Sequence, residues 1–147
     1  MRNILRTFVL FAVMATLSSC NWFETDNAGD LEGLWHVRSV EFKADGTKTD
    51  LSSERYYWAF QKKLLQMENK EGKAATLLWR FQKDENKLTI SQPYRYDREN
   101  GDEPLESTDL LAPYFIENLE ETFTIEHLGS GTMLLSSETV RLSFRKF

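Results

Sequence analysis

The chain has 147 residues, 41% of them hydrophobic and 28% charged, which suits one folded domain and excludes a disordered or many-pass membrane protein. Two of the 18 basic residues, Arg2 and Arg6, precede Cys20 and all 23 acidic residues follow it, so the part after Cys20 has a formal net charge of −7. This charge repels phosphate groups, and no stripe of basic and aromatic residues offsets it, which argues against nucleic-acid binding.

The first 19 residues have the pattern of a bacterial export signal. Arg2 and Arg6 form a basic start, and an apolar run follows from 8 to 17, with two serines after it. The run has ten residues, whereas a helix needs about 20 to cross a membrane. We therefore expect 1–19 to be a signal peptide that is removed, and not a permanent anchor.

The residues Leu17-Ser18-Ser19-Cys20 resemble the lipobox of bacterial lipoproteins, which implies that the Cys20 sulfur receives diacylglycerol and that fatty acids such as palmitate anchor the protein. Cys20 is the sole cysteine, so it has no partner for a disulfide within the chain. The alternatives are ordinary secretion with a free thiol and an uncleaved anchor. Asn21 is not the aspartate that retains lipoproteins at the inner membrane, so the resemblance implies the outer membrane of a Gram-negative bacterium.

Residues 20–30 are mostly polar after the first few positions and predict a flexible tether. The folded domain is expected over 31–147. Its first half consists of short apolar or alternating runs separated by turn residues, which predict strands. The predicted strands are 34–42, 55–61, 64–68, 76–82 and 87–91.

The second half continues the pattern after a short candidate strand at 94–96, with Pro93 at an edge or a bend because it cannot donate to a ladder. A polar loop covers 97–104. Apolar residues at helical spacing predict a helical turn or two within 108–119, limited by Pro113. Strands are then expected at 121–128, 132–136 and 140–144.

About eight strands and one short helix predict an all-β fold, a small antiparallel up-and-down β-barrel. Gly33-Leu34-Trp35, at the start of the first strand, resembles the Gly-x-Trp motif of lipocalins and related barrels. The closing strands also look like those of lipocalin-like bacterial lipoproteins. The resemblance spans 31–147 and implies that Trp35 closes the barrel base, with an arginine of the last strand, Arg141 or Arg145, packed across it.

Six side chains on the expected inner strand faces are candidates for the wall of a ligand cavity: Tyr56, Trp58, Phe60, Leu77, Trp79 and Phe81. The alternative is that these large side chains simply fill the barrel. His36 and His127 are the two histidines. Without a second cysteine they do not suggest a zinc site, and no cofactor is expected. No motif of nucleophilic, acid–base or phosphate chemistry is present, so we do not expect an enzyme.

Two hypotheses on function remain open. In the first, the membrane-anchored barrel binds a small apolar or amphipathic ligand, as the family resemblance implies. In the second, a filled barrel serves as a non-enzymatic accessory lipoprotein of the cell envelope that binds a protein or glycan partner, which the acidic surface and the polar loop at 97–104 suggest.

Overall fold

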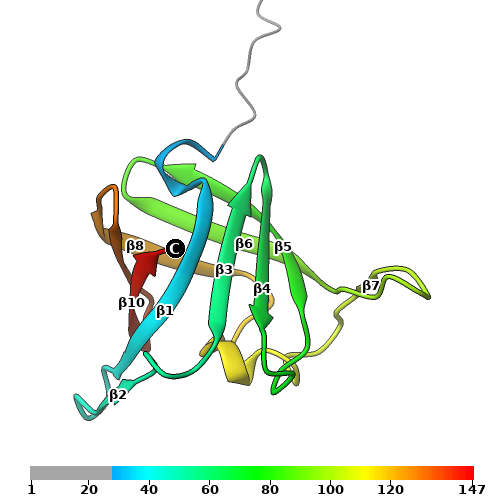
Figure 1. Ribbon diagram of the computed structural model, residues 1–147, viewed down its shortest axis with the longest axis horizontal. Coiled ribbons are helices and arrows are strands. Elements are labelled where there is room, and N and C mark those ends of the chain that lie inside the picture. The colour runs from blue at the N-terminus through cyan, green and yellow to red at the C-terminus, as the bar shows by residue number, and fades with distance from the viewer. Residues whose placement is uncertain (1–27) are drawn as a thin grey trace, which may run out of the picture.

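The computed structural model describes residues 28–147, which form one antiparallel β-barrel (Figure 1). The predicted signal peptide, Cys20 and most of the predicted tether lie outside the described residues. The elements are η1 (Gly29–Leu31), β1 (Gly33–Phe42), β2 (Lys48–Asp50), β3 (Tyr56–Gln61), β4 (Leu64–Asn69), β5 (Leu77–Asp84), β6 (Lys87–Arg95), β7 (Glu103–Pro104), η2 (Ala112–Tyr114), β8 (Glu121–Leu128), β9 (Thr132–Ser136) and β10 (Val140–Lys146).

Eight strands close the barrel in the order β1, β3, β4, β5, β6, β8, β9, β10, and each pairs with its neighbour in an antiparallel manner. Pairing of β10 with β1 completes the circle, with Trp35 opposite Lys146 and Phe42 opposite Val140. The predicted all-β, lipocalin-like barrel is therefore confirmed. The short strands β2 and β7 pair with the outer parts of β1 and β6.

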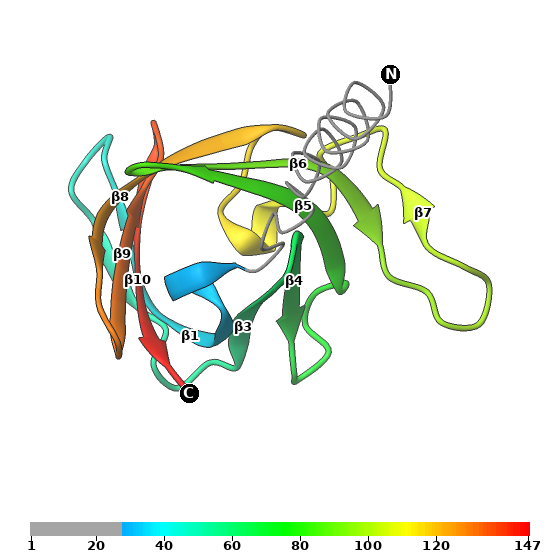
Figure 2. The ribbon, with the colours of Figure 1, turned by 90° about the horizontal axis from the view of Figure 1, so that it is seen from above.

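The two ends of the barrel are covered by different segments. The turn η1 lies over one end, here called the η1 end, beside the start of β1 and the end of β10 (Figure 1). Residues 105–120, here called the mouth segment, cross the opposite end and contain η2 (Figure 2). The loop between β6 and β7 projects from the barrel wall in the same view.

Strand β6 continues through Pro93 to Arg95, where separate strands had been predicted on either side. The pairing of β5 with β6 shifts between Leu78 and Arg80, and Gln92 has a φ of 51°. This irregularity absorbs a residue that has no N–H to donate, so the bend expected at Pro93 occurs within one strand.

The helix predicted within 108–119 is a single 3₁₀ turn, η2. Pro113 lies at its start, and Phe115 ends it in the left-handed conformation with a φ of 62°. Of the four apolar residues with helical spacing, Leu111 is buried, whereas Leu110, Phe115 and Leu119 are partly buried. Tyr114 and Ile116, which do not share that spacing, are each 2% exposed at the barrel end. Tertiary packing, and not helix formation, explains the pattern.

Candidate functional site

Trp35 closes the η1 end, as the sequence motif implied. Its side chain is fully buried, and its indole N–H donates a 2.7 Å hydrogen bond to the Leu31 carbonyl oxygen, which fixes η1 over the barrel. The Lys146 ammonium lies 5.2 Å from the centre of the Trp35 ring. Such a cation–π contact contributes about 0.5–2 kcal/mol, so the arrangement is structural.

Gly33 is required beside this contact for two reasons. Its φ of +125° lies in a region that side-chain-bearing residues rarely adopt. A Cβ at this position would also lie 2.7 Å from Lys146 Cε. Glycine therefore lets the Lys146 side chain cross to Trp35.

The cation on Trp35 differs from the expected one. Arg141 points outward and bonds to Glu41 and Glu126, at 3.0 and 2.9 Å, and Arg145 is exposed. Alternate residues of β10, starting from Val140, face the barrel interior. The inward position after Phe144 is therefore Lys146, whereas both arginines lie on the outward face. This alternation was visible in the sequence, but the family resemblance favoured an arginine.

The six residues predicted to line a cavity pack into the barrel interior. Trp58, Phe60, Leu77 and Trp79 are at most 1% exposed, and Tyr56 and Phe81 are half-buried. The Phe60 and Phe81 ring centres lie 5.1 Å apart. The space that remains beside Tyr56 and Trp58 has no room for a water molecule. The described side chains thus fill this part of the barrel instead of lining a cavity.

Tyr114 closes the interior at the end of the barrel opposite the η1 end, here called the η2 end. It is 2% exposed, and its hydroxyl donates to the carbonyl oxygens of Ala75, at 2.7 Å, and Met67, at 3.3 Å. Its ring meets the Tyr56 ring edge-on at 5.9 Å. Burial raises the pKa of the Tyr114 hydroxyl above its ordinary value, so this group stays neutral and acts as a donor.

The side chain of Phe115 points away from the barrel core, which Tyr114 enters, and toward Phe42. Its left-handed backbone conformation is strained for a bulky residue, and such strain is concentrated at functional sites. The conformation places the Phe115 ring 6.1 Å from the ring of Phe42, in an edge-on arrangement. Phe42 is 36% exposed, at the end of β1.

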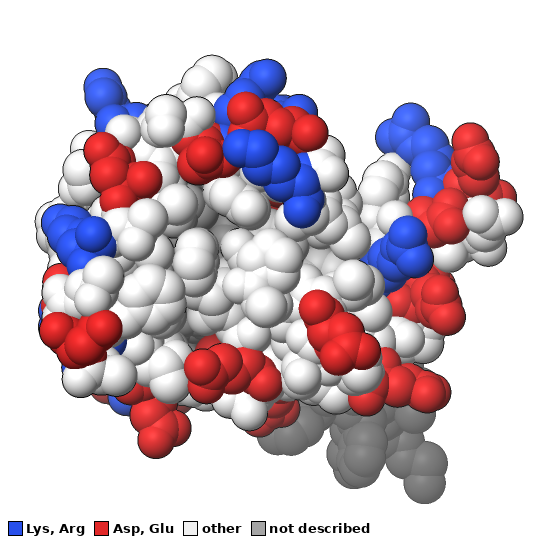
Figure 3. All heavy atoms as spheres, turned by 90° about the horizontal axis from the view of Figure 1, so that it is seen from below, with Lys and Arg blue, Asp and Glu red and all other residues white. Residues whose placement is uncertain are grey.

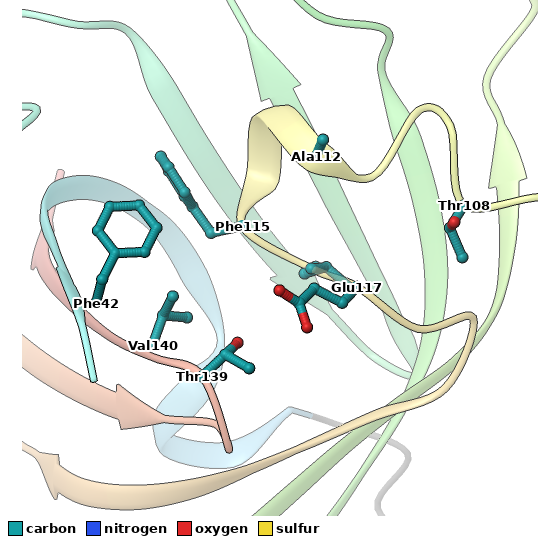
Figure 4. A pocket seen from close by; sticks show the side chains of 8 residues that line it. Phe42, Thr108, Ala112, Phe115, Glu117, Thr139 and Val140 are labelled. Atoms are coloured by element: carbon teal, nitrogen blue, oxygen red, sulfur yellow. The ribbon is translucent and has the colours of Figure 1, made fainter. Parts of the chain in front are cut away.

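A pocket of about 330 Å³ lies between these rings, the mouth segment and the turn from β9 to β10, here called the mouth pocket (Figure 4). Its volume is at the lower end of the range for small-molecule sites, about 300–1,000 Å³. Viewed toward this end, the molecule shows an uncharged, hollowed centre surrounded by charged side chains (Figure 3). The lining residues are Phe42, Thr108, Ala112, Phe115, Ile116, Glu117, Thr139 and Val140.

One charged group faces this pocket. The Glu117 carboxylate points toward Val140 and Thr139 (Figure 4), and it has no hydrogen-bond or ion-pair partner among residues 28–147. Apolar walls with few polar groups are typical of sites that bind amphipathic small molecules.

Little in the sequence indicates the mouth pocket. Its walls come from the end of β1, a tight turn and the mouth segment, which lie far apart in the chain. The left-handed conformation of Phe115 directs its ring to Phe42. Glycine and asparagine are the residues that usually predict this conformation, and neither occupies position 115.

Within residues 28–147, no group of three or more His, Cys, Asp or Glu side chains is placed to hold a metal ion. In the same residues, no helix has the length and apolar character needed to cross a membrane.

Comparison with known proteins agrees with the fold. The family model of the lipocalin-like domain matches residues 15–147. The chain belongs to the lipocalin-like family. Among solved structures, this lipocalin-like chain is similar to a lipocalin-like protein from Bacteroides uniformis ATCC 8492, with 24% identity and a TM-score of 0.62 over 81% of this chain and all of the other.

A second similar structure is an uncharacterized protein from Bacteroides eggerthii DSM 20697. It is 18% identical, with a TM-score of 0.54 over 80% of this chain and 99% of the other. At these identities both structures support the fold alone. No curated protein matches the chain.

Proposed function

We propose that this lipocalin-like protein is a lipoprotein of the cell envelope, anchored through Cys20, that binds a small apolar or amphipathic ligand in the mouth pocket. The observation that carries the proposal is the 330 Å³ volume bounded by Phe42, Phe115 and Val140. A binding role without catalysis agrees with the fold family, and the sequence has no motif of nucleophilic, acid–base or phosphate chemistry.

The ligand position proposed here is the mouth pocket and not the barrel interior. Trp58 and its neighbours occupy the interior, and Tyr114 covers it from the η2 end. A ligand deep in the barrel would have to displace several buried aromatic side chains, each of which contributes about 1.5–3 kcal/mol by its burial. The mouth pocket takes a ligand without that cost.

Filling the mouth pocket tests the proposal. Ala112 is exposed and lines the pocket, so Ala112→Trp adds an indole there without removing a buried group. We expect at least a tenfold loss of affinity for a neutral apolar fluorophore, N-phenyl-1-naphthylamine, measured by fluorescence titration. Ala44→Trp, an exposed substitution in the turn after β1, is the matched control and should bind as the wild type does. Equal binding by both variants counts against a ligand site here.

Replacement of Cys20 tests the anchor. Stable attachment requires two or more acyl chains, and in this proposal Cys20 carries them. We therefore expect Cys20→Ala to move the protein from the membrane to the soluble fraction. Incorporation of labelled palmitate should fall to background, as measured by fractionation and labelling of growing cells. A variant that stays in the membrane and still takes up palmitate contradicts lipidation at Cys20.

A second candidate function is that of an accessory lipoprotein whose filled barrel binds a protein or glycan partner. The filled interior favours it, as does the loop between β6 and β7, which projects from the wall (Figure 2). Crosslinking in intact cells separates the two functions. Adducts that form through residues of this loop, and that persist in Ala112→Trp, support the second function.

A further inference from the structure

We infer that the mouth pocket selects ligands with a cationic ammonium group attached to a short apolar body. This inference rests on the proposed function and specifies the ligand class of the same site. It is carried by the Glu117 carboxylate, the paired rings of Phe42 and Phe115, and the charge of the mouth segment.

Glu117 supplies the charge that would recognise a cation. Its carboxylate points into the mouth pocket (Figure 4) and has no partner among the described residues. No lysine or arginine lines the pocket. Lys43 follows the lining residue Phe42 in the chain but does not line the pocket, and its ammonium donates to the Ser137 carbonyl oxygen at 2.5 Å. The pocket therefore has an acceptor with one negative charge and no cation of its own.

The two phenyl rings suit the same ligand. Phe42 and Phe115 meet edge-on with their centres 6.1 Å apart, and both line the pocket. The faces of aromatic rings attract ammonium groups, and several rings around one cation form the usual site for quaternary ammonium ligands. Two rings and a carboxylate provide attraction for the head group, while Ile116 and Val140 provide an apolar surface for the rest of the ligand.

The surroundings add to this selectivity. The mouth segment has four acidic residues, Glu106, Asp109, Glu117 and Glu120, and no basic residue. A concentration of one sign of charge near a pocket raises the local concentration of oppositely charged ligands and repels those of like charge. An anionic amphiphile such as a fatty acid is therefore disfavoured beside the mouth segment; the basic side chains on the same face lie outside this segment (Figure 3).

A pair of ligands with the same chain and different head groups tests the inference. The mature protein, isolated from the cells that produce it, is placed in lipid nanodiscs, with empty nanodiscs as the blank. Octyltrimethylammonium and octanol then compete with bound N-phenyl-1-naphthylamine. We expect the cation to bind about three- to tenfold more tightly than the alcohol, which is the size of effect that partly exposed ion pairs and cation–π contacts produce. Added salt should reduce this ratio.

Substitution of the carboxylate locates the selectivity. Glu117→Gln should lower the ratio to near one while octanol binding is unchanged, and Glu99→Gln, in the projecting loop outside the pocket, should keep the ratio. Equal affinities of the wild type for the two ligands, or an equal loss of both in Glu117→Gln, would overturn the inference. Failure of the fluorophore itself to bind, or its equal binding to Ala112→Trp, would instead overturn the proposed function.

Discussion

Trp58→Ala is expected to lower the free energy of unfolding by about 3–5 kcal/mol, the usual cost of removing a buried tryptophan side chain. Trp58 is 1% exposed in the centre of the barrel. Its ring lies 5.0 Å from that of Phe144 and 5.8 Å from that of Phe123, so it joins β3 to β10 and β8. Surrounding rings held by three strands cannot collapse into the space that the substitution leaves, so we expect the upper part of this range.

Denaturant unfolding followed by circular dichroism measures the effect of Trp58→Ala. Tyr96→Ala is the control, because Tyr96 is an aromatic residue that is 37% exposed. Its removal should change stability by less than about 1 kcal/mol. Similar stabilities of the two variants would show that the barrel centre is loosely packed, and would restore the interior as a place for a ligand.

Tyr114→Ala has the second large expected effect. It should lower the free energy of unfolding by about 3–5 kcal/mol, with the largest local effect in the mouth segment. The substitution removes the donor to the carbonyl oxygens of Ala75 and Met67 and the ring that covers Tyr56. We expect amide hydrogens of residues 110–116 to exchange with solvent much faster, while those of β1 and β10 keep most of their protection. Uniform loss of protection across the barrel would show that the mouth segment is not a separate unit.

Tyr114→Phe isolates the hydroxyl group. Keeping the ring and losing the hydrogen bonds should cost about 1–2 kcal/mol at neutral pH. Because burial raises the pKa of Tyr114 in the folded state, the unfolded state releases the proton first, near pH 10. Stability that is complete below this pH is therefore lost as pH rises further, by up to about 1.4 kcal/mol per pH unit. The difference in stability between wild type and Tyr114→Phe should shrink above pH 10, and a constant difference would contradict the burial of the neutral hydroxyl.

The barrel was largely predictable because its strands alternate visibly between apolar and polar residues. Thr132–Ser136 matched its predicted limits, and β10, predicted at 140–144, extends two residues further to Lys146. Gly33 and Trp35 were found from their spacing and their position at the start of the first strand. Such local patterns survive folding because each strand buries one face.

The mouth pocket was not predictable in the same way. Phe42 and Phe115 are 73 positions apart in the chain. Their contact depends on the left-handed conformation of Phe115, which the local sequence does not predict. The same holds for the mouth segment, where apolar residues have helical spacing but the chain forms a single 3₁₀ turn. These residues are Leu110, Leu111, Phe115 and Leu119. A pattern of apolar residues shows what is buried and does not show what it is buried against.

Photolabelling shows directly where a ligand binds on this barrel. A neutral alkyl diazirine added to the mature protein and activated by light leaves a covalent label on the residues that it contacts, and mass spectrometry of peptides identifies them. We expect labels on the mouth pocket, in residues 108–117 and at Thr139 and Val140. Labels concentrated on the buried side chains of β3 and β5, such as Phe60 and Trp79, would contradict it.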